Sequence, residues 1–88
     1  MNRDRVGPPS PQVLETDIDG DISLYNPASE KVTVLNGTAS DVWLLCDGSH
    51  SMGEIKRLLA SSYQVEEVEI AGDIERTINE LRESGLIT

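Results

Sequence analysis

Cysteine, histidine and phenylalanine are scarce in this sequence of 88 residues, which has one Cys, one His and no Phe. The lone Cys46 excludes an intramolecular disulfide. The lone His50, with only Cys46 near it, leaves no set of side chains spaced like a metal site. No apolar run approaches the roughly 18 residues that a membrane-spanning helix needs, and no signal-peptide pattern is present. We therefore expect a cytoplasmic chain with no metal, cofactor or membrane partner.

Basic residues are also few, because 7 Lys and Arg stand against 16 Asp and Glu and leave a net charge of −9. Nucleic-acid binding draws much of its affinity from Lys and Arg, so this balance argues against DNA or RNA as a partner. The excess of acid favours a basic partner, whose approach it would accelerate. An equally simple interpretation is that the acidic residues only keep a small domain soluble.

The length of the chain predicts one small domain with a modest core. Residues 1–12 contain Pro8, Pro9 and Pro11 and show no periodic apolar pattern. Because prolines remove backbone donors and break regular structure, we predict a flexible tail over 1–12 and a folded domain over 13–88.

Alternating polar and apolar residues after Val13 predict three short strands. The first strand ends at Asp19-Gly20, a dipeptide typical of a two-residue hairpin turn, and residues 26–29 supply a second turn. These strands would pair as an antiparallel meander that is apolar on one side only, so other elements must cover that side. The expected strands are about 14–18, 21–25 and 30–36.

Side-chain alternation sets the faces of these strands. Ile22 and Leu24 would point inward from the second strand. The first strand has Leu14, Thr16 and Ile18 on one face, and the third has Val32 and Val34 on one face with Lys31, Thr33 and Leu35 on the other.

Helical spacing of apolar residues predicts three helices in the second half of the chain. Strands that precede helices, instead of alternating with them, indicate an α+β fold. The expected architecture is winged-helix-turn-helix-like, with a three-stranded antiparallel sheet followed by three helices. Capping residues set the bounds of these helices. The first runs from Thr38 or Asn36 to Asp47-Gly48, and the second begins at Ser51, where Glu54 completes a capping box. The third runs from Glu66 or Glu69 to about Ser84, before Gly85. The expected buried stripes are Ala39, Val42, Trp43 and Cys46, then Met52, Ile55, Leu58 and Leu59, and finally Ile74, Ile78 and Leu81 with Val68, Ile70 and Ala71.

Residues that could carry catalysis are poorly placed. Cys46 and His50 are four positions apart, as in a nucleophile and its base, but Gly48 lies between them and Cys46 shares the stripe of Trp43. We therefore interpret Cys46 as a buried structural thiol and His50 as a solvated loop residue. The carboxylates lie on outward faces and turns. The sequence predicts no active site.

The third helix and the third strand favour peptide binding over DNA binding. Residues 66–84 hold seven acidic side chains and only two arginines, a charge that a DNA groove would repel. The strand over 31–35 contains no proline, so its open edge could accept an extended peptide as a further strand. The alternative is an ordinary edge strand with no ligand.

Ordered dipeptides across residues 13–88 resemble the PqqD family, the pyrroloquinoline quinone biosynthesis protein D group. The matching residues in the first half are Leu35-Asn36, Thr38-Ala39, Val42-Trp43, Cys46-Asp47-Gly48 and Glu54-Ile55. In the second half they are Tyr63, Val68, Asp73-Ile74, Leu81 and Gly85-Leu86-Ile87.

This resemblance implies a RiPP recognition element, a small winged-helix domain that is not an enzyme. Such domains bind the leader segment of a ribosomally made precursor peptide and deliver it to a modifying enzyme or leader peptidase, in a radical-enzyme or lasso-peptide pathway. The leader would add as an antiparallel strand to the third strand and pack against the third helix. The implied contacts are Lys31, Val32, Thr33, Val34 and Leu35 on the strand, and Ile70, Asp73, Ile74, Arg76, Thr77 and Glu80 on the helix.

The acidic third helix further predicts a leader with basic residues. The competing hypothesis is a degenerate winged helix that acts as an adaptor in transcription or in protein–protein contacts.

Overall fold

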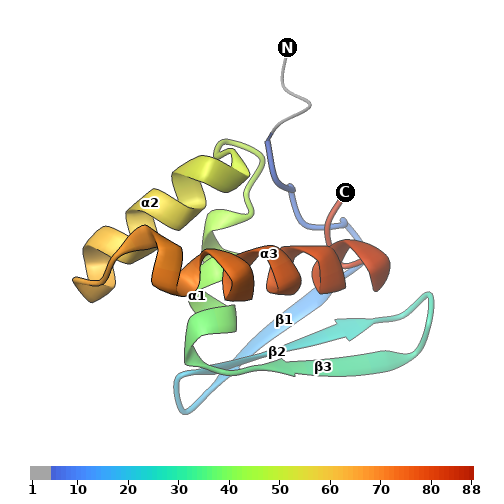
Figure 1. Ribbon diagram of the computed structural model, residues 1–88. Coiled ribbons are helices and arrows are strands. Elements are labelled where there is room, and N and C mark those ends of the chain that lie inside the picture. The colour runs from blue at the N-terminus through green and yellow to red at the C-terminus, as the bar shows by residue number, and fades with distance from the viewer. Residues whose placement is uncertain (1–4) are drawn as a thin grey trace.

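The computed structural model describes residues 5–88, which form a small sheet and three helices that lie on the same side of it (Figure 1). The α+β prediction is confirmed, because three strands come first and three helices follow. The elements are β1 (Leu14–Ile18), β2 (Asp21–Asn26), β3 (Lys31–Leu35), α1 (Gly37–Leu45), α2 (Met52–Tyr63) and α3 (Glu67–Glu83).

The sheet is an antiparallel meander in the order β1-β2-β3. Asp19 and Gly20, both at positive φ (53° and 87°), form the two-residue turn between β1 and β2. Positive φ at both positions is what a type I′ turn requires, and glycine adopts it without steric cost. The predicted hairpin at Asp19-Gly20 is confirmed.

The two faces of the sheet differ from the prediction. Ile22 and Leu24 are buried as expected (4% and 0% exposed), but Glu15 and Asp17 are their register partners on β1 and therefore share that inner face. The expectation that only one side is apolar is wrong, since the outer face carries Leu14, Ile18, Tyr25, Val32 and Val34, all exposed.

Each helix is preceded by an extended N-cap residue, and the side chains of Asn36 and Ser51 cap the first two. Asn36 accepts a hydrogen bond from the backbone N–H of Ala39, and Ser51 with Glu54 forms the predicted capping box. No helix among residues 5–88 is long and apolar enough to cross a membrane.

The core lies between the inner sheet face and the helices. Trp43 of α1 joins the two layers, because it is buried (4% exposed) and its indole N–H donates to the Glu15 carboxylate of β1 (Nε1–Oε1 2.7 Å). Two residues of the predicted stripes, Leu58 and Val68, are exposed instead. The buried hydrophobic residues are Val6, Ile22, Leu24, Leu35, Val42, Trp43, Cys46, Ile55, Leu59, Ala60, Ile74, Ile78, Leu81, Leu86 and Ile87.

The chain before Val13 packs on the domain over residues 5–12, so the prediction of a flexible tail is wrong there; residues 1–4 lie outside the described part. Val6 is fully buried, and its N–H and C=O pair with the backbones of His50 and Gly48. A Cβ on Gly7 would lie 2.1 Å from the Cys46 carbonyl oxygen, so only glycine permits this close approach.

The same segment also holds the C-terminus. The Ser10 N–H donates to the Leu86 carbonyl and its hydroxyl to the Gly85 carbonyl, while the Thr88 N–H donates to the Pro8 carbonyl. These bonds hold the two ends of the described chain side by side. The three prolines lie in an ordered segment that has isolated bridges and a turn in place of a regular strand or helix, so few backbone donors are needed there.

We expect Val6→Ala to lower the free energy of unfolding by about 1–2.5 kcal/mol, because a fully buried side chain would leave a cavity. Urea denaturation followed by Trp43 fluorescence measures the change. The matched control is Gln12→Ala at an exposed position, which should shift stability by less than about 0.5 kcal/mol. Equal effects of the two substitutions would show that this segment is not part of the core.

Candidate functional site

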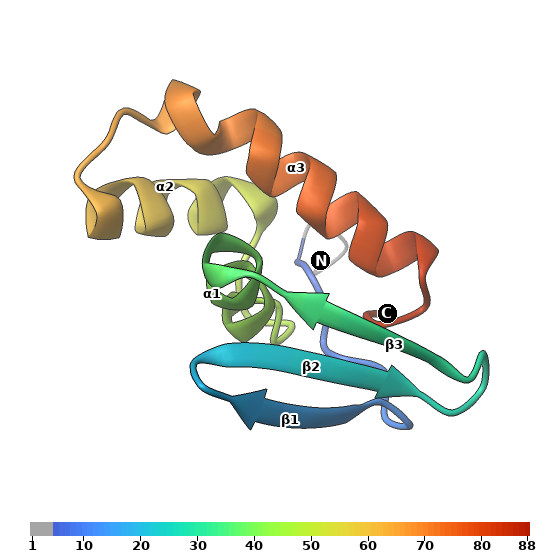
Figure 2. The ribbon, with the colours of Figure 1, turned by 90° about the horizontal axis from the view of Figure 1, so that it is seen from below.

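A groove runs between the open edge of β3 and the C-terminal half of α3. Figure 2 shows β3 as the strand beside α3, with β1 on the far side of the sheet. The larger hollow of this groove has a volume of about 470 Å³. Its lining comes from β3, the start of α1, and one face of α3 with the residues after it: Thr33, Val34, Leu35, Asn36, Thr38, Ala39, Asp73, Arg76, Thr77, Glu80, Leu81, Ser84 and Leu86.

A smaller hollow of about 240 Å³ continues the groove toward the β2–β3 turn. It shares Thr33, Ser84 and Leu86 with the larger hollow. The two hollows therefore form one track along β3, from its end at Leu35 to its start at Lys31. The lining of the smaller hollow is Asn26, Ser29, Lys31, Thr33, Glu83, Ser84 and Leu86.

The β1–β2 turn determines the direction of the backbone groups across the sheet. A two-residue turn is closed by a pair that exchanges both backbone hydrogen bonds, here Ile18 and Asp21. Since the backbone groups of successive residues in a strand alternate in direction, those of Asp21 face β1 and those of Ile22 and Leu24 face β3.

The same alternation identifies the free groups of β3. Thr33 and Leu35 lie opposite Leu24 and Ile22, so their N–H and C=O groups bond to β2. Val32 and Val34 occupy the alternate positions and direct theirs to the open edge, on the side of the groove. A bound strand would pair with these two residues.

The structure brings most of the predicted contact residues together. Seven of them line the larger hollow and Lys31 lines the smaller one. The seven are Thr33, Val34, Leu35, Asp73, Arg76, Thr77 and Glu80.

Three predicted contacts lie elsewhere. Ile74 is fully buried in the core, so its side chain is not available to a ligand, and Ile70 packs against the core without lining either hollow. The reason is helical geometry: Ile74 lies 100° around α3 from Asp73, on the stripe it shares with Ile78 and Leu81. The Val32 side chain points to the outer face of the sheet, although its backbone belongs to the open edge.

Several groove residues were missed by the sequence prediction. Ser84 and Leu81 continue the helical stripe of Thr77 and Glu80, so spacing alone could have suggested them. Asn36, Thr38 and Ala39 line the groove because α1 begins where β3 ends, and nothing in their spacing indicated this.

The charges of the groove are mixed and mostly acidic on the helix side. Asp73 and Arg76 form an ion pair one turn apart on α3 (2.5 Å). Glu80 and Glu83 form no ion pair with any residue of the described part of the chain. The helix wall thus offers two unpaired carboxylates, and the strand wall offers Lys31 at one end.

Comparison with known proteins identifies the family. The family model described as "Coenzyme PQQ synthesis protein D (PqqD)" matches residues 21–87. The chain belongs to the PqqD family. The resemblance read from the dipeptides around Trp43 is confirmed. No curated protein matches the chain closely enough in sequence to be called a relative.

Two solved structures share the PqqD-like fold of this chain. TbiB1 in complex with the TbiA(beta) leader peptide is 20% identical with a TM-score of 0.79, over 90% of this chain and 92% of that one. Lasso peptide synthetase B1 complexed with the leader peptide is 25% identical with a TM-score of 0.79, over 92% and 95%. Their similarity extends over almost the whole of both chains.

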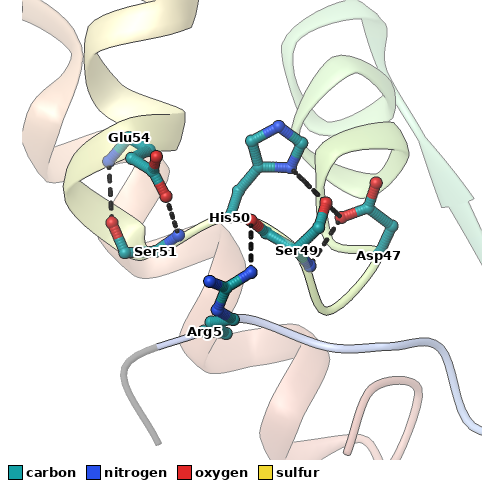
Figure 3. Close-up of polar contacts among 6 residues, drawn as sticks. All are labelled: Arg5, Asp47, Ser49, His50, Ser51 and Glu54. Carbon is teal, nitrogen blue, oxygen red and sulfur yellow. Dashed lines mark hydrogen bonds and ion pairs between the residues drawn. The ribbon is translucent and has the colours of Figure 1, made fainter. Parts of the chain in front are cut away.

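The family dipeptide Asp47-Gly48 lies in a polar loop between α1 and α2, away from the groove (Figure 3). Asp47 accepts hydrogen bonds from the Ser49 hydroxyl (2.6 Å) and backbone N–H (2.9 Å), and contacts the His50 ring (3.1 Å). Arg5 reaches the Ser49 carbonyl oxygen. His50, expected to be solvated, is instead partly buried and bonded within this loop.

Cys46, which precedes this loop, is a buried free thiol, as predicted. Burial raises the pKa of Cys46 to about 12 and outweighs the nearby positive charge of Arg82. Because the thiolate is the reactive form of cysteine, the folded chain keeps Cys46 unreactive.

We expect Cys46 in the folded chain to resist alkylation by iodoacetamide at mildly alkaline pH, because the thiol is both buried and protonated. Mass spectrometry after timed quenching measures the rate. The same chain unfolded in urea is the control and should react at the rate of a free thiol. Equal rates in the two states would contradict the buried position.

The pKa of Asp47 is lowered from 3.8 to about 2, first by the Ser49 side-chain hydrogen bond and then by the Ser49 backbone. Since the folded-state pKa lies below the ordinary value, the ionised carboxylate stabilises the fold above pH 3.8, and this stabilisation is lost as pH falls through about 2. Asp47→Asn should therefore be less stable than the wild type above pH 3.8, with the difference shrinking toward pH 2. Urea midpoints across this range test it, and a constant difference would contradict it.

Proposed function

We propose that this chain is a non-catalytic domain that binds the leader segment of a ribosomally made precursor peptide. The leader adds as an antiparallel strand to β3 and lies in the groove against α3. The observation that carries the proposal is the open edge of β3, where two residues direct free backbone groups to the side of a continuous groove. Main-chain pairing provides affinity in this mode of binding, and the groove provides specificity.

The structural neighbours support this function. Both are complexes with leader peptides, and the one at 25% identity is a lasso peptide synthetase B1. Of the two pathways implied by the family, lasso-peptide biosynthesis therefore has the stronger support, ahead of a radical-enzyme pathway. We propose that the bound precursor is delivered to a modifying enzyme or leader peptidase in the cytoplasm.

The charge of the groove supports a basic leader. Glu80 and Glu83 on the helix wall have no ion-pair partner among residues 5–88, and the chain carries a net charge of −9. A Lys or Arg of the leader would find a carboxylate there, and the long-range field would accelerate its approach.

The alternative, an adaptor that works in transcription, has less support. The exposed face of α3 is acidic, with Glu67 and Glu69 in its first turn, so this helix would be repelled from a DNA groove. Titration with leader peptide and with duplex DNA separates the proposed function from that of an adaptor that binds DNA.

We expect Val34→Pro to abolish leader binding and preserve the fold, because proline removes an N–H that faces the open edge and not one that pairs with β2. The measurement is fluorescence anisotropy with the labelled leader of any precursor peptide that is found encoded next to this chain. Circular dichroism checks that the variant is folded.

Thr33→Pro is the matched comparison, because it removes a donor to β2 and should unfold the sheet. Labelled duplex DNA in the same titration tests the adaptor hypothesis. Leader binding that survives Val34→Pro would place the peptide away from β3, and binding of DNA without leader binding would overturn the proposed function.

A further inference from the structure

We propose that the leader peptide bound in this groove has an apolar, a basic and an apolar residue in succession at the three positions opposite Val34, Thr33 and Val32. The inference rests on the proposed function and specifies the peptide chemistry that the site selects. It follows from the register of β3, the exposed valines on the outer face, and the unpaired carboxylates of α3.

The open edge of β3 determines which residues of an added strand form hydrogen bonds with it, and on which face their side chains lie. A peptide residue opposite Val34 or Val32 would exchange backbone hydrogen bonds with it, and its side chain would lie on the same outer face. The residue between them lies opposite Thr33, whose side chain lines both hollows. Successive side chains of the peptide therefore point outward, into the groove, and outward again.

The outward positions favour apolar side chains. Val32 and Val34 are 61% and 67% exposed, although they stand on a sheet. Val32 lies beside Tyr25 in the register, and Tyr25 lies beside Leu14, so one apolar row crosses all three strands and ends at the open edge. An apolar peptide side chain would extend this row and bury the free flank of each valine.

The inward position favours a basic side chain. Across the groove from Thr33, α3 presents Glu80, with Glu83 one turn further along. Asp73 is already paired with Arg76. Among the described residues that line the larger hollow, Glu80 is therefore the carboxylate without an ion-pair partner. A Lys or Arg side chain that enters the groove would bring its positive charge toward this carboxylate.

The test uses three synthetic peptides with identical Thr-rich flanks and the centres Val-Lys-Val, Thr-Lys-Thr and Val-Glu-Val. Each is titrated into the isotope-labelled full chain and followed by NMR, beside the natural leader. Shifts of the Val32 and Val34 amide signals report strand addition, and the dependence on concentration gives the Kd.

We expect Val-Lys-Val to bind about fivefold more tightly than Thr-Lys-Thr, through cross-strand apolar pairs. We expect it to bind roughly tenfold more tightly than Val-Glu-Val, since attraction to Glu80 is replaced by repulsion. Two sets of variants test these causes. The preference for Val-Lys-Val over Thr-Lys-Thr should vanish in the double variant Val32→Thr and Val34→Thr, which keeps β-branched side chains.

The preference for Val-Lys-Val over Val-Glu-Val should shrink in Glu80→Gln. It should persist in Glu67→Gln, which changes the net charge equally and lies outside the groove.

The outcomes separate this inference from the proposed function. Equal affinities of the three peptides, all with shifts at Val32 and Val34, would overturn the tripeptide preference and leave strand addition intact. Shifts caused by the natural leader but by none of the three peptides would also overturn the preference. If the leader fails to shift these amides as well, the proposed function itself is wrong.

Discussion

The register imposed by the turn at Asp19-Gly20 is the constraint on which the sheet and its binding edge depend. It pairs Ile18 with Asp21, so Leu14 and Ile18 share the outer face while Glu15 lies inward. It also directs the backbone groups of Ile22 and Leu24 toward β3 and leaves those of Val32 and Val34 free. A register one residue different would reverse both results, because side chains and backbone groups alternate with a period of two.

Glu15 lies on the inner face at the exposed outer strand β1, where its carboxylate can reach the core. Its carboxylate accepts the Trp43 indole N–H, which would otherwise be a buried donor without a partner. This bond joins β1 to α1, whereas Leu35 joins β3 to the same core. The family dipeptides around Trp43 therefore hold the sheet against the helices, and the groove lies beside them.

Helix α3 divides its surface between the core and the groove. Ile74 and Ile78 lie on the buried stripe, and the residues directly before them, Asp73 and Thr77, line the groove; Leu81, at the end of the stripe, belongs to both. A hundred degrees of helical rotation thus separates a residue that stabilises the fold from one that can touch a ligand. The family resemblance implies both Ile74 and Asp73 as contacts, whereas helical spacing places Ile74 in the buried stripe, and the structure agrees with the spacing.

The amino-acid sequence by itself determined the order of three strands and three helices, the caps at Asn36 and Ser51, and the family, because these depend on local patterns. The sequence also implies that Leu14 and Ile18 lie on the outer face, since a two-residue turn sets their register with the second strand. Only the tertiary structure decided that Val6 completes the core and that the start of α1 lines the groove. Those results depend on which distant segments meet, and no local periodicity encodes such contacts.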